Sequence, residues 1–277
     1  MHIDLSPLRE SRDFRLLIAA RTVSHSGNMV TYVAVPFQVY ALTRSSLVVG
    51  LVSLAEFVPI LVVAFVGGAL ADAMDRRFMV RLTELGLCGV SVCLLLNALL
   101  PQPQLWVVFL AASLAAGLDA LQRPSLDALV PRLVRPEQLT AAGAIESVGG
   151  ESAHVIGPAL AGLLIAGVGL PVTFGVDIAT FVVSLIALSL MHSSPPPPDA
   201  ARPSLTSIRD GIRYALHRRD LLGTYLVDMN AMFFGMPIAL FPQIATQFGG
   251  ASVLGLLYAA PAFGGLLAAT ASGWASR

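Results

Sequence analysis

Long apolar segments recur along the whole chain, and this recurrence limits the folds that are open to it. Segments of about 20 apolar residues are long enough to cross a bilayer as α-helices, and too long for barrel strands of about ten residues. Lipid leaves helices and closed barrels as the only spanning structures. We therefore predict an all-α membrane protein with about eight transmembrane helices, near residues 14–42, 46–72, 78–100, 104–129, 139–168, 171–191, 219–246 and 251–275.

The composition supports a location in the membrane. Of the 277 residues, 56% are hydrophobic and only 12% are charged. A soluble domain this apolar could not cover its surface with polar groups. The sequence contains no nucleotide-binding loop, no nucleophile constellation and no metal-ligand spacing. It therefore predicts a multi-pass membrane protein that is not an enzyme, needs no metal or other cofactor and binds no nucleic acid.

Arginine placement predicts the orientation, because cytoplasmic connections are enriched in basic residues. Arginine-rich connections alternate with connections that hold one arginine or none. The sequence therefore predicts a protein of the cell membrane with its N-terminus in the cytoplasm. The arginines of the predicted cytoplasmic side are Arg9 and Arg12, then Arg76, Arg77 and Arg81, then Arg132 and Arg135, and then Arg202, Arg209, Arg213, Arg218 and Arg219.

Residues 192–218 differ in composition from the segments around them. The run Pro195–Pro198 predicts a stiff extended spacer, and apolar residues at helical spacing after it predict an amphipathic helix on the inner membrane surface. This linker divides a six-helix half, residues 1–191, from residues 219–277. A weak internal repeat at a shift of 205 residues places Gly50 on Gly255 and supports the division. We expect residues 219–277 to form the first two helices of a second, incomplete half, both packed against the first six.

A dense cluster of charges lies between the second and third predicted helices. An acid at one helix end that faces arginines across a tight turn can latch two helices in one conformational state and release them in another. The alternative is a solvated turn whose arginines only fix the topology. The pattern of Gly68, Asp72, Arg76 and Arg77 resembles the loop between helices two and three of the major facilitator superfamily, although Ala73 and Asp75 depart from that pattern.

Three further stretches resemble the enterobactin-exporter and macrolide-efflux branch of that superfamily: Ser24–Asn28 with Tyr40–Ser46, Arg123–Ser125 with Val130–Val134, and Asp228–Pro237 with Leu240–Pro242. The resemblance covers essentially the whole chain. It implies an efflux antiporter with a helical bundle whose six-helix halves rock about a central cavity. The partners so implied are the lipid bilayer, a small-molecule substrate and protons, with the protein acting as a monomer.

Ionisable side chains within the predicted helices are the candidates for proton coupling or substrate binding. Asp228 lies mid-helix in apolar surroundings with Asn230 nearby, where a carboxyl group could exchange a proton. It could instead be a packing residue, bonded to helix backbone or to Arg21. Glu56 could face the cavity or reach toward the outer surface. We expect Asp228 or Glu56 to exchange protons.

Two pairs of polar residues have two interpretations each. Arg21 and His25 share one face of the first predicted helix, and could bind an anionic group of a substrate or pair with Asp228. Glu151 and His154 lie three residues apart in the fifth predicted helix and could share a proton. A structural polar contact is the favoured interpretation for this second pair.

Two other motifs predict structural roles. Asp119 and Arg123 are four residues apart and predict an ion pair on one helix face. Gly157 and Pro158, followed by Gly162, predict a close helix contact and a bend. The Gly-Pro pair also resembles an element associated with antiporters of the superfamily.

Two classes of function remain open from the sequence. The first is a proton-driven exporter of amphipathic small molecules, drug-like or siderophore-like, that works by alternating access. The second is a fragment without transport activity, acting as a membrane scaffold or arising from an interrupted transporter gene. The sequence does not name the substrate.

Overall fold

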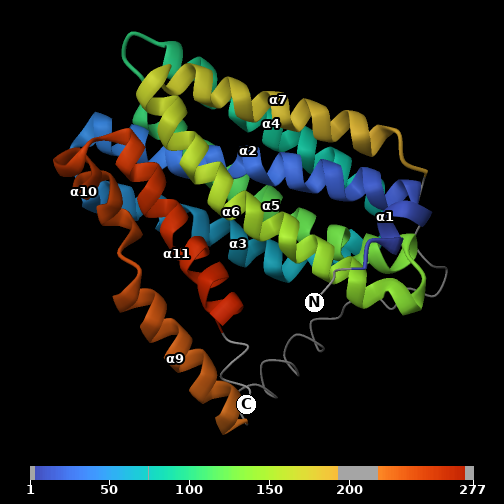
Figure 1. Cartoon of the computed structure of the whole chain (residues 1–277). Helices are drawn as coiled ribbons and strands as arrows, with labels where there is room; N and C mark the ends of the chain where they lie inside the picture. The colour runs from blue at the N-terminus through green and yellow to red at the C-terminus, as the bar shows by residue number, and fades with distance from the viewer. Residues whose placement is uncertain (1–3, 74, 193–217, 272–277) are drawn as a thin grey trace.

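Helices make up all the regular structure of the described chain (Figure 1). The computed structural model describes residues 4–73, 75–192 and 218–271, without the side chains of residues 64–73, 219–221, 232–233 and 269–271. The α-helices are α1 (Ser6–Glu10), α2 (Arg12–Thr43), α3 (Ser46–Ala73), α4 (Arg76–Leu99), α5 (Leu105–Leu133), α6 (Leu139–Gly167), α7 (Leu170–Ser189), α9 (Arg219–Gly235), α10 (Phe241–Phe248) and α11 (Ala251–Ala271), with short 3-10 helices η1 (Pro136–Gln138) and η2 (Ile238–Leu240). The predicted linker falls almost entirely outside the described residues.

The first six predicted transmembrane segments correspond to α2 to α7, with ends that differ by a few residues. Among the described residues, six helices are long and apolar enough to cross a membrane: α3, α4, α5, α6, α7 and α11. Helix α2 is 32 residues long but more polar, because side chains such as those of Ser24 and Gln38 face the bundle interior. An all-α membrane protein is therefore confirmed, and the count of eight spans is not.

The seventh predicted helix, over 219–246, is broken in two. Helix α9 ends at Gly235, and α10 begins at Phe241 after a 3-10 turn. Pro237 explains the break, because proline lacks a backbone N–H and disfavours helical geometry in the residue before it. Hydrophobic spacing alone does not register this interruption.

Helix α2 lies at the centre of the described bundle (Figure 1). It packs against α6 and α7; α4 packs between α5 and α7, and α3 packs along α5. Helix α11 packs along α6, whereas the described side chains of α9 are almost all exposed. Our expectation that both helices of residues 219–277 pack against the first six is therefore wrong for α9. The break at Pro237 separates α9 from α10 and lets α9 point away from the bundle.

The core consists of two apolar clusters separated along the helix axes. One lies at the end where α2 begins and α7 ends, and includes Phe14, Val80 and Leu188. The other lies toward the opposite end, and includes Val33, Leu94 and Phe174. On α2, α4 and α7, buried polar residues such as Ser24, Glu84 and Ser184 lie between these clusters, and they form part of the candidate site described below.

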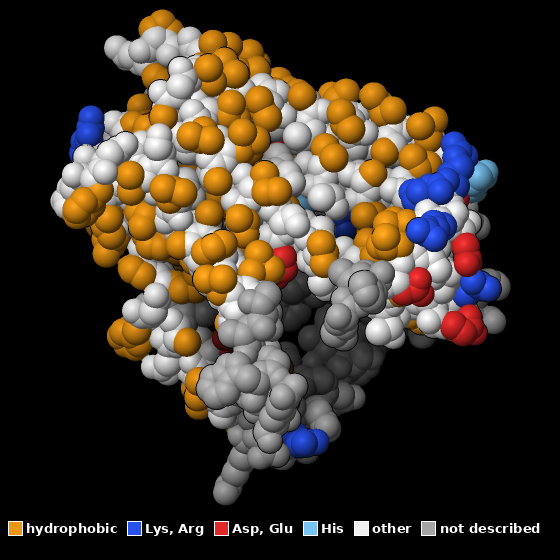
Figure 2. All heavy atoms as spheres, viewed as in Figure 1, with side chains coloured by type: hydrophobic (Ala, Val, Ile, Leu, Met, Phe, Trp, Pro, Cys, Tyr) orange, Lys and Arg blue, Asp and Glu red, His pale blue; other side chains and the backbone are white. Residues whose placement is uncertain are grey.

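The outer surface is apolar along the bundle and charged at one end. Figure 2 shows hydrophobic side chains spread over the visible face, with most of the charged side chains of that face at one end. Large apolar residues such as Leu85, Leu163 and Val183 are more than half exposed on α4, α6 and α7. This distribution fits a belt of lipid around the bundle.

Helices α6 and α11 cross at two glycines. A methyl group added at Gly162 would come within 2.8 Å of the Ala251 carbonyl oxygen and 2.9 Å of the Gly255 Cα atom. One added at Gly255 would come within 2.5 Å of the Pro158 carbonyl oxygen. The backbones therefore touch here, as small residues permit at helix contacts within membranes.

We predict that Gly162→Ala destabilises the protein by about 1–3 kcal/mol through overpacking. Gly143→Ala is the control on the same helix, because a methyl group there would have no atom within 4 Å. The control should be neutral or slightly stabilising, since alanine favours helix over glycine by about 1 kcal/mol. Thermal unfolding in detergent measures both, and equal unfolding midpoints for the two variants would contradict the close crossing.

Candidate functional site

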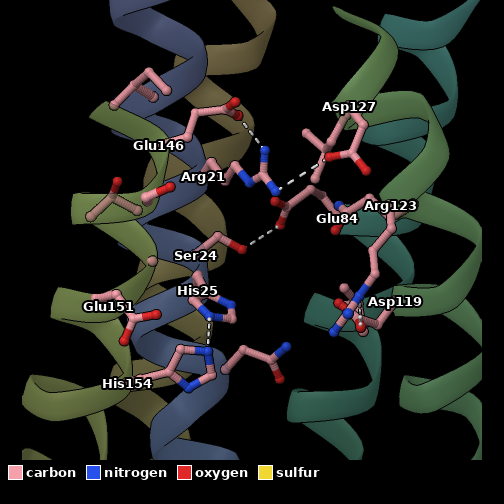
Figure 3. A pocket seen from close by; sticks show the side chains of 18 residues that line it. Arg21, Ser24, His25, Glu84, Asp119, Arg123, Asp127, Glu146, Glu151 and His154 are labelled. Carbon is pink, nitrogen blue, oxygen red and sulfur yellow. Dashed lines mark hydrogen bonds and ion pairs between the residues drawn. The ribbon is translucent and has the colours of Figure 1, made fainter. Parts of the chain in front are cut away.

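Two adjoining cavities lie inside the bundle. The first, which we call the polar cavity, has a volume of about 360 Å³ and is lined mainly by α2, α5 and α6 (Figure 3). The second, which we call the apolar cavity, has a volume of about 680 Å³ and extends to α3, α10 and α11. The two share the side chains of His25, Asn28, Asp119, Arg123 and His154 in their walls, so they are neighbouring parts of one interior space.

Arg21 on α2 bridges two acids across the polar cavity (Figure 3). One of its terminal nitrogens donates to Glu146 on α6, and the other lies 3.5 Å from Asp127 Oδ1 on α5. The Arg21 and Glu146 side chains are 34% and 21% exposed, so this ion pair is partly shielded from water. Arg21 therefore ties α2 to α6 and α5, and pairs with these acids rather than with Asp228.

The histidines of the site meet one another. His25 Nε2 lies 3.4 Å from His154 Nε2, with the two rings edge to face. One ring must therefore donate while the other accepts. Glu151 lies on the same cavity wall with its side chain exposed, and the described contact of His154 is with His25 rather than with Glu151. The sequence suggested neither this pairing nor the link it makes between α2 and α6.

Asp119 and Arg123 form the ion pair that their spacing predicted. Arg123 Nε lies 2.9 Å from Asp119 Oδ2 on the same face of α5. The pair stands at the junction of the two cavities. The structural interpretation is therefore confirmed, and the pair also places charge beside the interior space.

Glu56 on α3 lines the apolar cavity. Tyr32, Phe241 and Tyr258 line the same cavity and stack edge to face, with Tyr258 between the other two rings at centroid distances of 5.3 Å. This position matches the interpretation that Glu56 faces the cavity, rather than the one in which it reaches toward the outer surface.

Asp228 and Asn230 lie on α9, with exposed side chains. Asn230 Nδ2 donates to the Leu226 carbonyl oxygen one turn earlier. Neither residue lines either cavity. The structure therefore does not bring Asp228 together with Arg21 or His25.

The predicted latch is only partly described. Gly68 and Asp72 lie on α3, with side chains outside the description, and Arg76 begins α4. Arg77 donates from Nε to the Leu188 carbonyl oxygen at 2.9 Å and from Nη2 to that of Ser189 at 2.7 Å. It thus binds the last carbonyl groups of α7, where a cation is favourable.

Asp75 and the glycine–proline element have local structural roles. Asp75, which departs from the superfamily pattern, caps α4 by accepting from the Phe78 N–H at 2.9 Å. A methyl group at Gly157 would come within 2.9 Å of the Ser26 carbonyl oxygen on α2, and Pro158 is buried beside it. Residues 157–162 of α6 thus approach α2 on one side and α11 on the other.

Sequence reasoning missed a buried acid at the wall of the polar cavity. Glu84 on α4 is 4% exposed. Its Oε2 accepts from the Ser24 hydroxyl on α2, and its Oε1 accepts from the Ser184 hydroxyl on α7, both at 3.0 Å. Gln122 on α5 lies beside it.

A second missed acid, Asp177 on α7, lies deeper in the bundle. It is 1% exposed, and its Oδ2 accepts from the Thr31 hydroxyl on α2 and from the Ser91 hydroxyl on α4, both at 2.6 Å. Neither cavity includes it in its lining. Each acid is therefore bound by hydroxyl groups from two other helices.

The two acids and their partners form a polar seam in two layers. Helices α2, α4 and α7 each contribute one residue to each layer. On each helix, its two seam residues are seven positions, or about two helical turns, apart. Because α4 and α7 are antiparallel, the acid of each faces the serine of the other. The first layer is Ser24, Glu84 and Ser184, and the second is Thr31, Ser91 and Asp177. This repeated spacing is the signal by which the sequence could have revealed them.

Comparisons with known proteins are consistent with this architecture. A family model described as "Transmembrane secretion effector" matches residues 3–274. The enterobactin exporter EntS of Shigella flexneri is 33% identical over 273 residues, which cover 98% of this chain and 65% of that protein. The enterobactin exporter of Escherichia coli O1:K1 is 32% identical over the same coverage. The chain thus spans 65% of the length of these relatives.

Solved structures of transporters share the fold. A POT family transporter in complex with a thioalcohol-conjugated peptide has a TM-score of 0.55 and 12% identity, covering 85% of this chain and 50% of that one. An auto-inhibited POT family peptide transporter has a TM-score of 0.55 and 13% identity, covering 92% of this chain and 52% of that one. At these identities the likeness concerns the fold alone.

We predict that Arg21→Gln destabilises the protein more than Arg123→Gln. Loss of Arg21 leaves Glu146 without its partner in a half-buried site, which should cost about 1.5–3 kcal/mol. The Arg123 side chain is 68% exposed and pairs within its own helix, where such pairs contribute only about 0.3–0.5 kcal/mol. Thermal unfolding in detergent compares the two, and an equal or larger loss for Arg123→Gln would contradict the bridging role of Arg21.

Proposed function

We propose that this chain, which belongs to the transmembrane secretion effector family of the major facilitator superfamily, exports amphipathic small molecules by proton-coupled alternating access. The family consists of transporters rather than enzymes. Export from the cell is the activity named for the relatives above. Drug-like and siderophore-like compounds are the substrate classes that we propose.

The observation that carries this proposal is the pair of adjoining cavities. A volume of about 680 Å³ lies within the range of about 300–1,000 Å³ typical of sites for drug-sized ligands. Its aromatic wall of Tyr32, Phe241 and Tyr258 suits an apolar body. The neighbouring polar cavity carries Arg21 and Arg123 beside their acid partners, and these charged groups suit a polar, hydrogen-bonding head. An amphipathic molecule matches this arrangement.

For proton coupling we propose Glu56 as one of the exchanging groups. An acid within a membrane bundle is costly to keep charged, and such residues commonly mark ion or substrate pathways. Glu56 lines the apolar cavity, so substrate and proton would compete for adjacent space. Asp228 was the other candidate, and its exposed position on α9 supports the role less well.

We place the arginine-bearing end of the bundle in the cytoplasm, following the distribution of basic residues. Alternating access would then open the cavities to one membrane face at a time. The latch of Gly68, Asp72, Arg76 and Arg77 would close the cytoplasmic side. In this scheme Arg77 holds α4 to α7 through the α7 carbonyl groups, and loss of the Asp72 charge would unlatch the inward-closed state.

The first test is efflux from intact cells that produce the protein. We expect loaded dye or antibiotic to leave faster than from cells without it, and a protonophore to abolish the difference. Glu56→Gln should lower efflux to the protonophore-treated level at equal membrane abundance. Glu137→Gln, on the exposed turn η1, is the matched control. Efflux that persists after the gradient has collapsed would reject proton coupling, whereas absence of export for every compound class would reject the function.

The second test concerns the latch. Asp72→Asn should impair export without reducing membrane insertion, because arginines rather than acids set topology. Asp4→Asn, an exposed acid outside the predicted helices, serves as the control. Normal efflux by the Asp72→Asn protein at equal abundance would remove the latch role.

A further inference from the structure

The partners of Glu84 set it apart from the three acids of the polar cavity that pair with arginine. Asp119, Asp127 and Glu146 each have an arginine as partner. Glu84 is bound instead by the hydroxyl groups of Ser24 and Ser184. Figure 3 shows the Ser24 contact at the cavity wall. The neighbouring acids are therefore held by cations, and Glu84 is held by neutral groups.

This difference determines which protonation states each site can hold. A guanidinium group is always charged and only donates hydrogen bonds, so an acid beside it loses the attraction between opposite charges when it takes up a proton, and its carboxylate form is favoured. A hydroxyl group can donate to a carboxylate or accept from a carboxylic acid after rotating its proton. Glu84 can therefore keep its hydrogen bonds whether it is charged or neutral, without a change in the packing of α2, α4 and α7.

The position of Glu84 supplies the second requirement, a route for the proton. Glu84 and Ser24 both belong to the lining of the polar cavity. Asp177 has the same kind of partners, two hydroxyl groups, but it is absent from the lining of both cavities. The two acids thus have the same kind of partners, but Glu84 itself borders a cavity, whereas Asp177 is separated from the apolar cavity by its partner Thr31, which lines it.

We propose that Glu84 is a proton-binding site that exchanges with water in the polar cavity. A hydronium ion in the cavity transfers its proton to Glu84 Oε2, and a water molecule leaves. The Ser24 hydroxyl turns from donor to acceptor, and the charge of the site changes from minus one to zero. Deprotonation to cavity water reverses each step. The use of this proton in transport rests on the function proposed above, whereas the binding itself does not.

Other ionisable groups around Glu84 belong to every helix that surrounds it. Their charges contribute to the electrostatic potential at Glu84 and therefore to the pH at which it binds a proton. They are Arg21 and His25 on α2, Arg81 and Cys88 on α4, Asp119, Arg123 and Asp127 on α5, Glu146, Glu151 and His154 on α6, and Asp177 on α7.

The test is infrared spectroscopy of the purified chain in detergent, titrated with acid and base. Glutamate labelled with ¹³C at the side-chain carboxyl separates glutamate signals from those of aspartate. Because the other glutamates carry the label too, we expect the difference spectrum of wild type minus Glu84→Gln to show a reversible band of protonated, labelled carboxyl, which is the Glu84 band. The amide of glutamine can still bond both hydroxyls, so the fold should persist. Asp177→Asn is the matched control and should keep the band.

Ser24→Ala provides a second variant that keeps the acid. Removal of the cavity-side partner should shift the midpoint of the Glu84 band, while Ser91→Ala, which alters the other layer, should leave it in place. A labelled band that is unchanged in folded Glu84→Gln would overturn the proposal.

The infrared result is separate from the transport result. Loss of the band in Glu84→Gln would support the proton site even if efflux proved independent of the proton gradient, which would reject only the coupling. Conversely, gradient-driven efflux with an unchanged band would support the proposed function and reject Glu84 as its proton site.

Discussion

The interaction on which the bundle depends is the burial of two carboxyl groups between α2, α4 and α7. A buried acid in apolar surroundings is costly unless it is hydrogen-bonded, and each acid of the seam obtains two hydroxyl partners from the two other helices. Between lipid-embedded helices there is little hydrophobic drive, so packing and hydrogen bonds decide the contacts. Rotation of any of the three helices would break bonds in both layers. The seam therefore fixes their mutual register between the two apolar clusters.

This register explains how α2 can serve two surfaces at once. Residues three or four apart lie on one face of a helix. Ser24 and Thr31 bond to the seam at the edge of the cavities, whereas Arg21, His25 and Asn28 border the cavities without joining the seam. Gly27, on the seam side, allows α7 to come close: a methyl group there would lie 2.7 Å from Asp177 Oδ1. Helix α2 thus packs against α4 and α7 on one side and borders the cavities on the other. Helices α5 and α6 enclose the remaining sides.

The sequence predicted the helices well because apolar length is a strong signal, and seven of the eight segments match helices α2 to α7 and α11. The break at Pro237 escaped because hydropathy continues through it. Asp228 was singled out since its sequence neighbours are apolar, but apolar neighbours do not separate a lipid-facing helix side from a core-facing one. Glu84 and Asp177 were overlooked for the opposite reason. Their role depends on which helices pack together. The seven-residue spacing between acid and serine on α4 and on α7 indicates a contact only when these two helices are known to be antiparallel neighbours. The ion pair of Asp119 and Arg123 was predictable because it is local.

Helix α2 is bonded on both sides, but the two sets of bonds differ in their exposure to a substrate. Toward α6, the contacts of Arg21 with Glu146 and of His25 with His154 cross the polar cavity, so a bound anion or polar group would compete for them. Toward α4 and α7, the seam bonds lie behind α2, where a substrate in the cavities has no access to Asp177. A substrate would therefore act on the α2–α6 side while the seam keeps α2, α4 and α7 together. Glu84 belongs to both sets, because it is a member of the seam and also lines the polar cavity. Glu84 is thus the acid of the seam that borders a cavity directly, and a change of its charge would act on both the seam and the polar cavity.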